Sequence, residues 1–160
     1  MTEGKNITLQ VDNVVLHVDG HWLRNYSNDF LNAAKSFTEP KNRFSPVRYY
    51  LVCHSIELSL KSFLFTAGYK KKERKKLNHN LEKALFAAES NGLNSHIDIT
   101  SNDREILIKA NKLYPKKEFE YFESFETIYD PHDFDLDDLE LFADRLINAI
   151  EIPVKQSVVS

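Results

Sequence analysis

Two pairs of arginine and histidine residues have a spacing that suits chemistry on a phosphate group. Five residues separate Arg48 from His54, and four separate Arg74 from His79. A histidine can transfer a proton near neutral pH, and an arginine can stabilise negative charge that develops on a phosphate. A chain of 160 residues with 6 His and as many Arg contains roughly 0.7 such pairs by chance, so the spacing by itself is a weak signal.

Helix geometry separates the members of the first pair. On the helix predicted for this stretch, six steps put Arg48 and His54 about 120° apart. The polar residues that share a face of about 60° with His54 are instead Tyr50, Glu57 and Lys61. This polar stripe either lines a cleft or forms a buried hydrogen-bond network with an ordinary ion pair between Glu57 and Lys61. We give the network more weight, because structural ion pairs also occupy such positions.

The second pair lies beside the most basic segment of the chain. Residues 70–76 are predicted to form a loop, with His79 at the start of the next helix. Free backbone N–H groups there and the nearby lysines could hold a phosphate, which makes this the best candidate for anion binding. The simpler alternative is a solvated loop whose histidine helps to cap a helix. The candidate phosphate-binding residues are Lys70, Lys71, Lys72, Arg74, Lys75 and Lys76.

An all-α framework is predicted to position these residues. Apolar residues recur at spacings of three and four, and the stretches end near Pro or Gly. The predicted helices cover residues 22–37, 46–68, 78–90, 101–114 and 135–150. Ser45 is expected to cap the second helix, with Pro46 at its first position. Residues 7–18 are predicted to form a short β-hairpin or an extended arm, and residues 116–134 support no firm assignment.

The whole chain, residues 1–160, is expected to be one domain, because this length buries a sufficient core. We predict an N-terminal arm (residues 1–20), an up-and-down bundle of five or six helices (21–151) and a C-terminal tail (152–160). Cys53 is the single cysteine, which excludes an intrachain disulfide, and it is expected in the core. No apolar run approaches a membrane span and no signal-like segment is present, so we expect a cytoplasmic protein with no membrane partner.

Charge is unevenly distributed along the sequence. Residues 116–151 contain 3 basic and 12 acidic side chains, a net charge of −9, whereas the whole chain carries −3. The overall charge therefore gives no general reason to expect nucleic acid. A phosphate-bearing ligand would be attracted to the part before residue 116 and repelled by the acidic region, which is a candidate surface for a protein partner.

Three short motifs point to a known family. The segment Ile56–Leu64 reads Ile-Glu-Leu-Ser-Leu-Lys-Ser-Phe-Leu, the tripeptide His79-Asn80-Leu81 opens the next predicted long helix, and Tyr114-Pro115 ends a later one. Together they resemble the HEPN family of small all-α domains, whose second helix often carries a similar Ile-Glu-Leu-x-Leu-Lys segment followed by a His-Asp-Leu helix start. The resemblance covers about residues 20–150 and is most specific over residues 50–85.

This resemblance implies a helical bundle that forms a homodimer and has a link to RNA. HEPN proteins include metal-independent ribonucleases, toxins paired with nucleotidyltransferases, and inactive modules that bind RNA or a nucleotide. In the ribonucleases, the histidine of an Arg-x4–6-His motif transfers a proton during attack by the RNA 2′-hydroxyl, and the arginine stabilises the charge that develops on the phosphate. Neither pair in this chain lies where that motif usually occurs, and the corresponding residues 114–126 contain neither Arg nor His.

Three functional hypotheses follow, and none requires a metal or a cofactor. The favoured one is a non-catalytic HEPN-like module that binds RNA, a nucleotide or a partner protein, as part of a defence or toxin–antitoxin-type system. The second is an active metal-independent ribonuclease, whose candidate catalytic residues are His79, Arg74, His54 and Glu57. The third is a protein-interaction domain that acts through the acidic C-terminal region.

Overall fold

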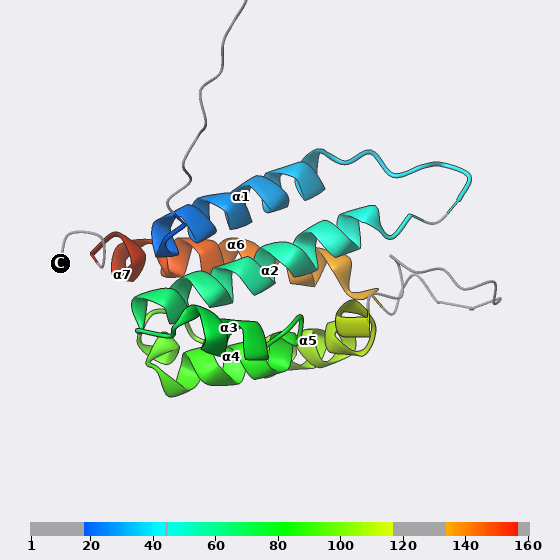
Figure 1. Cartoon of the computed structure of the whole chain (residues 1–160). Helices are drawn as coiled ribbons and strands as arrows, with labels where there is room; N and C mark the ends of the chain where they lie inside the picture. The colour runs from blue at the N-terminus through cyan, green and yellow to red at the C-terminus, as the bar shows by residue number, and fades with distance from the viewer. Residues whose placement is uncertain (1–17, 44, 117–133, 157–160) are drawn as a thin grey trace, which may run out of the picture.

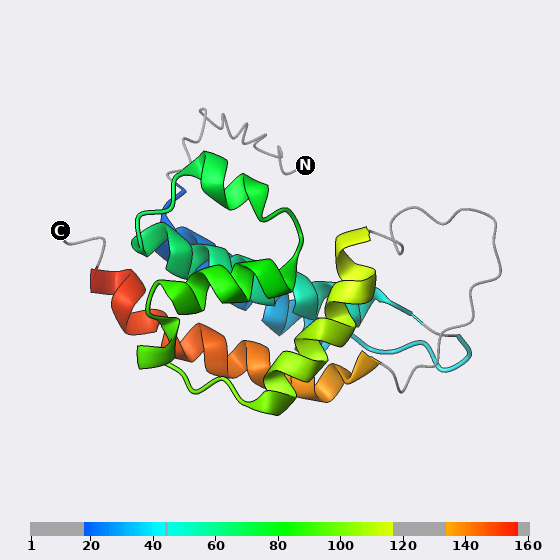
Figure 2. The ribbon, with the colours of Figure 1, turned by 90° about the horizontal axis from the view of Figure 1, so that it is seen from below.

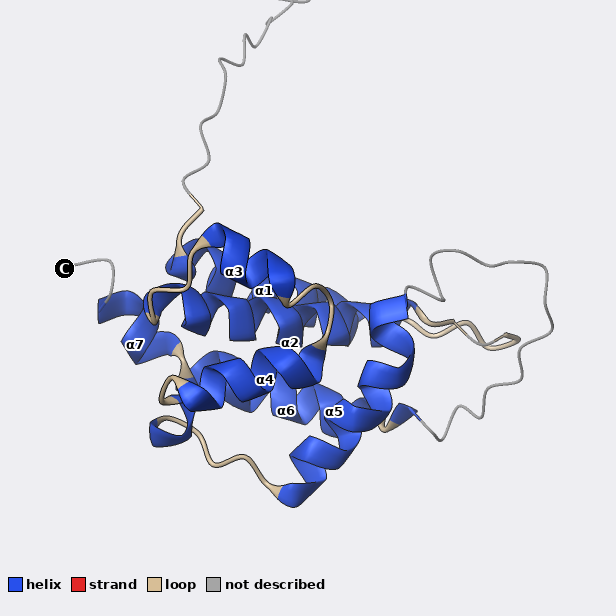
Figure 3. Ribbon diagram, turned by 60° about the horizontal axis from the view of Figure 1, so that its bottom comes forward, coloured by secondary structure: helices blue, strands red, loops and turns tan. Residues whose placement is uncertain are grey.

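Apolar residues at helical spacing produce a bundle of helices, as the sequence predicts. The computed structural model describes residues 18–43, 45–116 and 134–156, and within these ranges it contains helices and no strand (Figures 1 and 3). The longer helices are α1 (Gly20–Ser36), α2 (Val47–Thr66), α4 (Leu81–Ser90), α5 (Ser101–Leu113) and α6 (Leu136–Ala149). The shorter elements are α3 (Lys71–Lys76), α7 (Glu151–Gln156) and two 3-10 turns, η1 (Leu93–Ser95) and η2 (Tyr114–Lys116). None of the described helices is both long and apolar enough to cross a membrane.

Helix α2 is the centre of the bundle. Helix α1 runs antiparallel to it on one side, α3 and α4 lie on the other, and α6 packs behind (Figure 1). Twelve of the twenty residues of α2 are buried, among them Val52, Ile56 and Leu60 with no exposed surface. Cys53 is also fully buried in this core, as expected, and burial raises the pKa of its thiol to about 12. The polar stripe predicted for α2 therefore lies on a largely enclosed helix, and its members Tyr50, His54 and Lys61 are among the partly exposed side chains.

Small residues allow α1 and α2 to approach closely. The Ser27 hydroxyl lies 2.6 Å from that of Ser59, and the Ser62 hydroxyl donates to the Gly20 carbonyl at 2.6 Å. A Cβ atom added at Gly20 would lie 3.0 Å from Thr66 Cγ2, so this crossing has little room for a larger residue. Packing of this kind fixes the position of α1 along α2, and with it the residues that flank the polar stripe.

Several helix ends differ from those predicted. Helix α1 begins at Gly20 because the Asp19 side chain accepts a hydrogen bond of 2.7 Å from a backbone N–H of the first turn. The prediction that Ser45 caps α2 is wrong. Pro46 occupies the cap position, and the Ser45 hydroxyl is 3.5 Å from the backbone nitrogen of Val47, too far for a strong hydrogen bond.

The basic segment predicted as a loop is a helix, α3. Glu73 makes this possible, because its carboxylate accepts a hydrogen bond of 2.7 Å from the backbone N–H of Lys70 at the start of the helix. Residues 152–156 also belong to a helix, α7, rather than to a tail, and Val154 is buried there. The hairpin or arm predicted at 7–18 lies, except for its last residue, outside the described residues.

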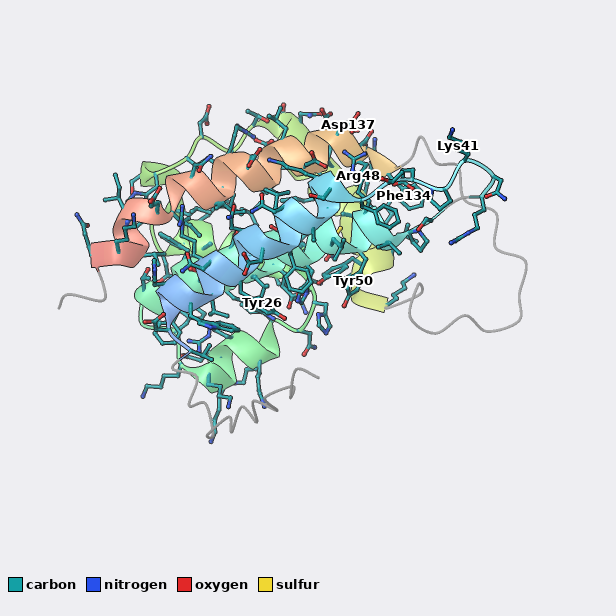
Figure 4. The ribbon with its side chains drawn as sticks, turned by 90° about the horizontal axis from the view of Figure 1, so that it is seen from above. Tyr26, Lys41, Arg48, Tyr50, Phe134 and Asp137 are labelled. Carbon is teal, nitrogen blue, oxygen red and sulfur yellow. The ribbon has the colours of Figure 1, made fainter. Side chains whose placement is uncertain are left out.

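The described part of the acidic region helps to hold the bundle together. Helix α6 begins with Asp135 as its N-terminal cap residue, and Lys109 of α5 binds this carboxylate at 2.7 Å. Arg48 of α2 binds Glu140 at 2.7 Å and Asp137 at 3.2 Å (Figure 4). Much of the negative charge of α6 is thus already paired within the chain.

Candidate functional site

The polar stripe of α2 meets two other segments at the Glu57 carboxylate. Glu57 is only 3% exposed, and its Oε1 accepts a charged hydrogen bond from Lys61. Its Oε2 accepts a hydrogen bond from the Tyr114 hydroxyl at 2.5 Å and lies 3.0 Å from His79 Nδ1 and 3.6 Å from His54 Nδ1. These five side chains, here called the Glu57 cluster, come from α2, from η2 and from the turn before α4.

The hydrogen bonds determine how the two imidazoles are oriented. An ionised carboxylate only accepts hydrogen bonds, so Nδ1 of His79 must donate its proton to Glu57. The Tyr114 hydroxyl donates a hydrogen bond to Glu57, so its oxygen is the acceptor in the 2.9 Å hydrogen bond with His54 Nδ1. In both rings Nδ1 carries the proton, and in the neutral ring Nε2 is the nitrogen that can accept a proton or bind a ligand.

Electrostatics keep Glu57 charged and Tyr114 neutral. Burial alone would raise the pKa of Glu57, but its neighbours His54, Lys61 and Tyr114 hold that pKa well below its ordinary value. Burial, together with the charge of Glu57, raises the pKa of Tyr114. Near neutral pH the cluster therefore contains a buried carboxylate that accepts hydrogen bonds from Lys61, Tyr114 and His79.

The turn between α3 and α4 is fastened to α2 at the same place. Lys61 Nζ donates to the Asn78 carbonyl at 2.9 Å, in addition to its bond with Glu57. Asn78 has a φ of 49°, in the left-handed region that asparagine tolerates better than most residues. This tight turn brings His79 back toward Glu57, and the Asn80 side chain then caps α4 by accepting from a backbone N–H at 2.8 Å.

Neither arginine of the predicted pairs lies beside its histidine. Arg48 faces α6, on the side of α2 opposite to Tyr50, as the calculated separation of Arg48 and His54 predicts (Figure 4). Arg74 lies 4.3 Å from the ring centre of Phe65, and burial lowers the pKa of its guanidinium. Phe65 is eight residues beyond Glu57, about 12 Å along the helix. His54 and His79 therefore come together at Glu57, whereas Arg48 and Arg74 do not.

The lysines of α3 form an exposed basic surface next to the Glu57 cluster. The segment 70–76 contains six basic residues and one acidic residue, a net charge of +5. The exposed members are Lys70, Lys71, Lys72, Lys75 and Lys76. Helix α3 ends two residues before Asn78, so this surface, the α3 lysines, leads directly into the turn that carries His79. Within the cluster, His79 is the most open side chain at 36% exposure, followed by His54 at 20%.

Tyr114 is the residue of the cluster that the sequence does not reveal. Its place before Pro115 marks it only as the end of a helix, and it lies 57 positions after Glu57 in the sequence. The polar stripe itself is predicted correctly, and so is the ion pair between Glu57 and Lys61. In the described ranges, no group of three or more His, Cys, Asp or Glu side chains is arranged to hold a metal ion. No family model, curated protein or solved structure matches the chain.

Proposed function

We propose that the chain is a HEPN-like module that binds RNA through the α3 lysines and the open edge of the Glu57 cluster. The observation that supports this most directly is the exposure of four lysines on one short helix and of a fifth at its N-terminal cap, beside a half-buried imidazole. Lysines arranged in this way neutralise successive phosphates and release the counterions bound to them. The helical bundle and the motif on α2 agree with the HEPN-like assignment, and homodimer formation belongs to the same proposal.

Binding without cleavage fits the Glu57 cluster better than catalysis does. Among the described residues, no arginine stands beside His54 or His79 to stabilise charge on a phosphate, and Lys61 is already paired with Glu57. The acidic region is a weaker candidate for a partner surface, because Asp137 and Glu140 are paired with Arg48. The α3 lysines thus remain the surface whose charge is best suited to a ligand.

Neutralising the α3 lysines is expected to weaken RNA binding and to reduce its dependence on salt. For a single strand, each phosphate contact contributes a slope of about −0.7 in the logarithm of affinity against the logarithm of salt concentration. Replacing Lys71, Lys72 and Lys75 with glutamine should therefore reduce the slope by about 2 units and lower the affinity at least about tenfold at 50 mM salt. Fluorescence anisotropy with a labelled RNA of about 20 nucleotides, between 50 and 200 mM salt, measures both effects.

A charge-matched control distinguishes the α3 lysines from net charge alone. Lys41, Lys112 and Lys155 are exposed and lie outside α3, so their triple replacement by glutamine makes the same change in charge. This control is expected to retain nearly the wild-type slope. The proposal fails if wild-type protein does not bind RNA at 50 mM salt, or if both triple variants lose the same affinity.

Metal-independent RNA cleavage is a second candidate, and one observation favours it. His54 and His79 both hold their Nδ1 protons toward the Tyr114–Glu57 pair, which leaves two Nε2 atoms that could exchange protons with a ribose hydroxyl and a leaving oxygen. Such a reaction would produce a cyclic phosphate and a free 5′-hydroxyl, and it would persist in EDTA.

The expected result is that the wild-type protein does not cleave RNA in EDTA above the background rate. If cleavage occurs, His54→Ala and His79→Ala should each reduce it by about 10²-fold or more, the usual contribution of a general acid or base. His96→Ala is the matched control, because this exposed histidine contacts Phe63 outside the Glu57 cluster. Cleavage that depends on His54 and His79, but not on His96, would replace the binding proposal with the catalytic one.

A further inference from the structure

A continuous row of aromatic rings runs along α1 and crosses to α2. Trp22 and Tyr26 have ring centroids 4.8 Å apart, and Tyr26 and Phe30 have centroids 4.9 Å apart. Phe30 meets the edge of His54 at 4.5 Å, and His54 stacks on Tyr50 with an angle of 8° between the rings and 5.9 Å between their centroids. These five side chains, here called the aromatic row, share His54 with the Glu57 cluster.

The aromatic row is not the face of α1 that forms the core. The core face is made by Ser27, Leu31 and Ala34, which have no exposed surface. Trp22, Tyr26 and Phe30 follow one another at intervals of four residues, about 100° around the helix from that face. Tyr26 is 39% exposed, and the other rings of the row are partly exposed. Rings in this position have faces and edges that a ligand can reach.

The aromatic row and the α3 lysines lie on the same side of the molecule. Tyr26 of α1 and Tyr50 of α2 both lie on the side along which α3 runs (Figure 4), and the opposite view also shows α3 on that flank of the α1–α2 pair (Figure 2). At the Glu57 cluster Tyr114 links the two features. Its hydroxyl lies 2.9 Å from His54 Nδ1 of the aromatic row, and its ring packs edge-on against His79, three residues beyond α3, at 5.9 Å. A positive surface beside a line of aromatic rings is the usual platform for a single-stranded nucleic acid.

We infer that the aromatic row is a base-stacking surface that selects single-stranded RNA. The inference rests on the proposed function: the α3 lysines hold the phosphates, and Tyr26 and Trp22 stack on bases. Every base has a π face, so such stacking tolerates different sequences. The bases of a duplex are already stacked on one another, so they cannot use this surface. Single-stranded RNA should therefore bind more tightly than duplex RNA of the same length.

Trp22 is a built-in reporter for the experiment, because it is the only tryptophan in the chain. We expect single-stranded RNA to quench Trp22 fluorescence on saturation, while duplex RNA of the same length and inorganic polyphosphate leave it nearly unchanged. Tyr26→Leu should lower the affinity for the single strand about tenfold and leave the affinity for the duplex unchanged. Tyr26→Phe should retain the wild-type affinity, because it keeps the ring.

The outcomes separate this inference from the proposed function on which it rests. Unchanged single-strand affinity in Tyr26→Leu, or a constant Trp22 signal at saturation, overturns base stacking even if binding still depends on the α3 lysines. Equal losses for single strand and duplex in Tyr26→Leu overturn it as well, since that result indicates a general disturbance of α1. Failure of the wild type to bind any RNA at low salt rejects both proposals.

Discussion

The Glu57→Gln variant should unfold with a free energy about 3 kcal/mol lower than that of the wild type at neutral pH. Glutamine has nearly the same shape, so the change removes the charge and keeps the packing. Lys61 then loses its buried counter-ion, and His79 and Tyr114 lose the carboxylate to which they donate. Breaking a buried ion pair typically costs about 3–5 kcal/mol. The lower value applies here because Lys61 and His79 are partly exposed and can turn toward water.

The chain contains a matched control for this substitution. Glu105 and Lys109 have the same spacing of four residues on a helix, but Glu105 is 67% exposed and lies 3.6 Å from the lysine. Exposed pairs of this kind contribute little, so Glu105→Gln is expected to unfold like the wild type. Urea denaturation followed by circular dichroism measures both variants. Equal stabilities of Glu57→Gln and Glu105→Gln would show that the buried carboxylate does not hold α2 to the α3–α4 turn.

The same carboxylate is expected to make the protein sensitive to acid. Burial alone would raise the pKa of Glu57, but His54 and Lys61 lower it below the ordinary value of 4.5. The carboxylate therefore stabilises the folded chain above about pH 4.5, and this contribution is lost as the pH falls below that value. The stability difference between the wild type and Glu57→Gln should be largest near neutral pH and shrink in acid. A difference that stays constant down to about pH 3 would contradict this assignment.

Phe142→Ala is expected to lower the free energy of unfolding by about 3–5 kcal/mol. Phe142 is among the largest side chains with no exposed surface, and it lies on α6 where that helix faces the core. Truncation removes the transfer free energy of the ring and leaves a cavity that the neighbouring helices fill only in part. The guanidinium of Arg145, 5.8 Å from the ring centre, also loses its aromatic partner.

Phe86→Ala is the control for this variant, since it makes the same chemical change at a surface position. Phe86 lies on α4 and is 72% exposed, so its truncation is expected to change the unfolding free energy by less than about 0.5 kcal/mol. Thermal and urea unfolding of the two variants side by side measure the comparison. A similar loss of stability in both would mean that Phe86 is covered, for instance by a second copy of the chain.

Local patterns predict most of the helices, because caps and periodicity act within a few residues. Thr100 and Asp103 cap each other at the start of α5, and Asn80 caps α4 where the sequence predicts a helix start. The α3 helix is missed for a physical reason. A run of like charges disfavours a short helix, and the hydrogen bond from the Lys70 backbone N–H to Glu73 offsets this only once the helix has formed. Composition therefore indicates a loop where a helix exists.

Three of the five residues of the Glu57 cluster could be predicted in the same way. The stripe of Tyr50, His54, Glu57 and Lys61 follows from helix geometry alone, since all four lie on one helix. The positions of His79 and Tyr114 beside Glu57 do not follow from helix geometry. They depend on how α4 and α5 pack and on the turn at Asn78. Long-range packing also decides where Arg48 and Arg74 point. Spacing along the chain pairs each arginine with a histidine, whereas the fold pairs both histidines with one carboxylate.

The central position of α2 limits how this sequence can change during evolution. It packs against α1, α4, α6 and α7, twelve of its residues are buried, and it also carries His54, Glu57 and Lys61 of the Glu57 cluster. A substitution on this helix that leaves the packing intact can still disturb the Glu57 cluster, and one that leaves the cluster intact can still disturb the packing. Variation should instead collect at exposed positions of α4 and α5, such as Phe86 and Ile108. Relatives would then be recognised by the residues of one helix, while the rest of the chain diverges around it.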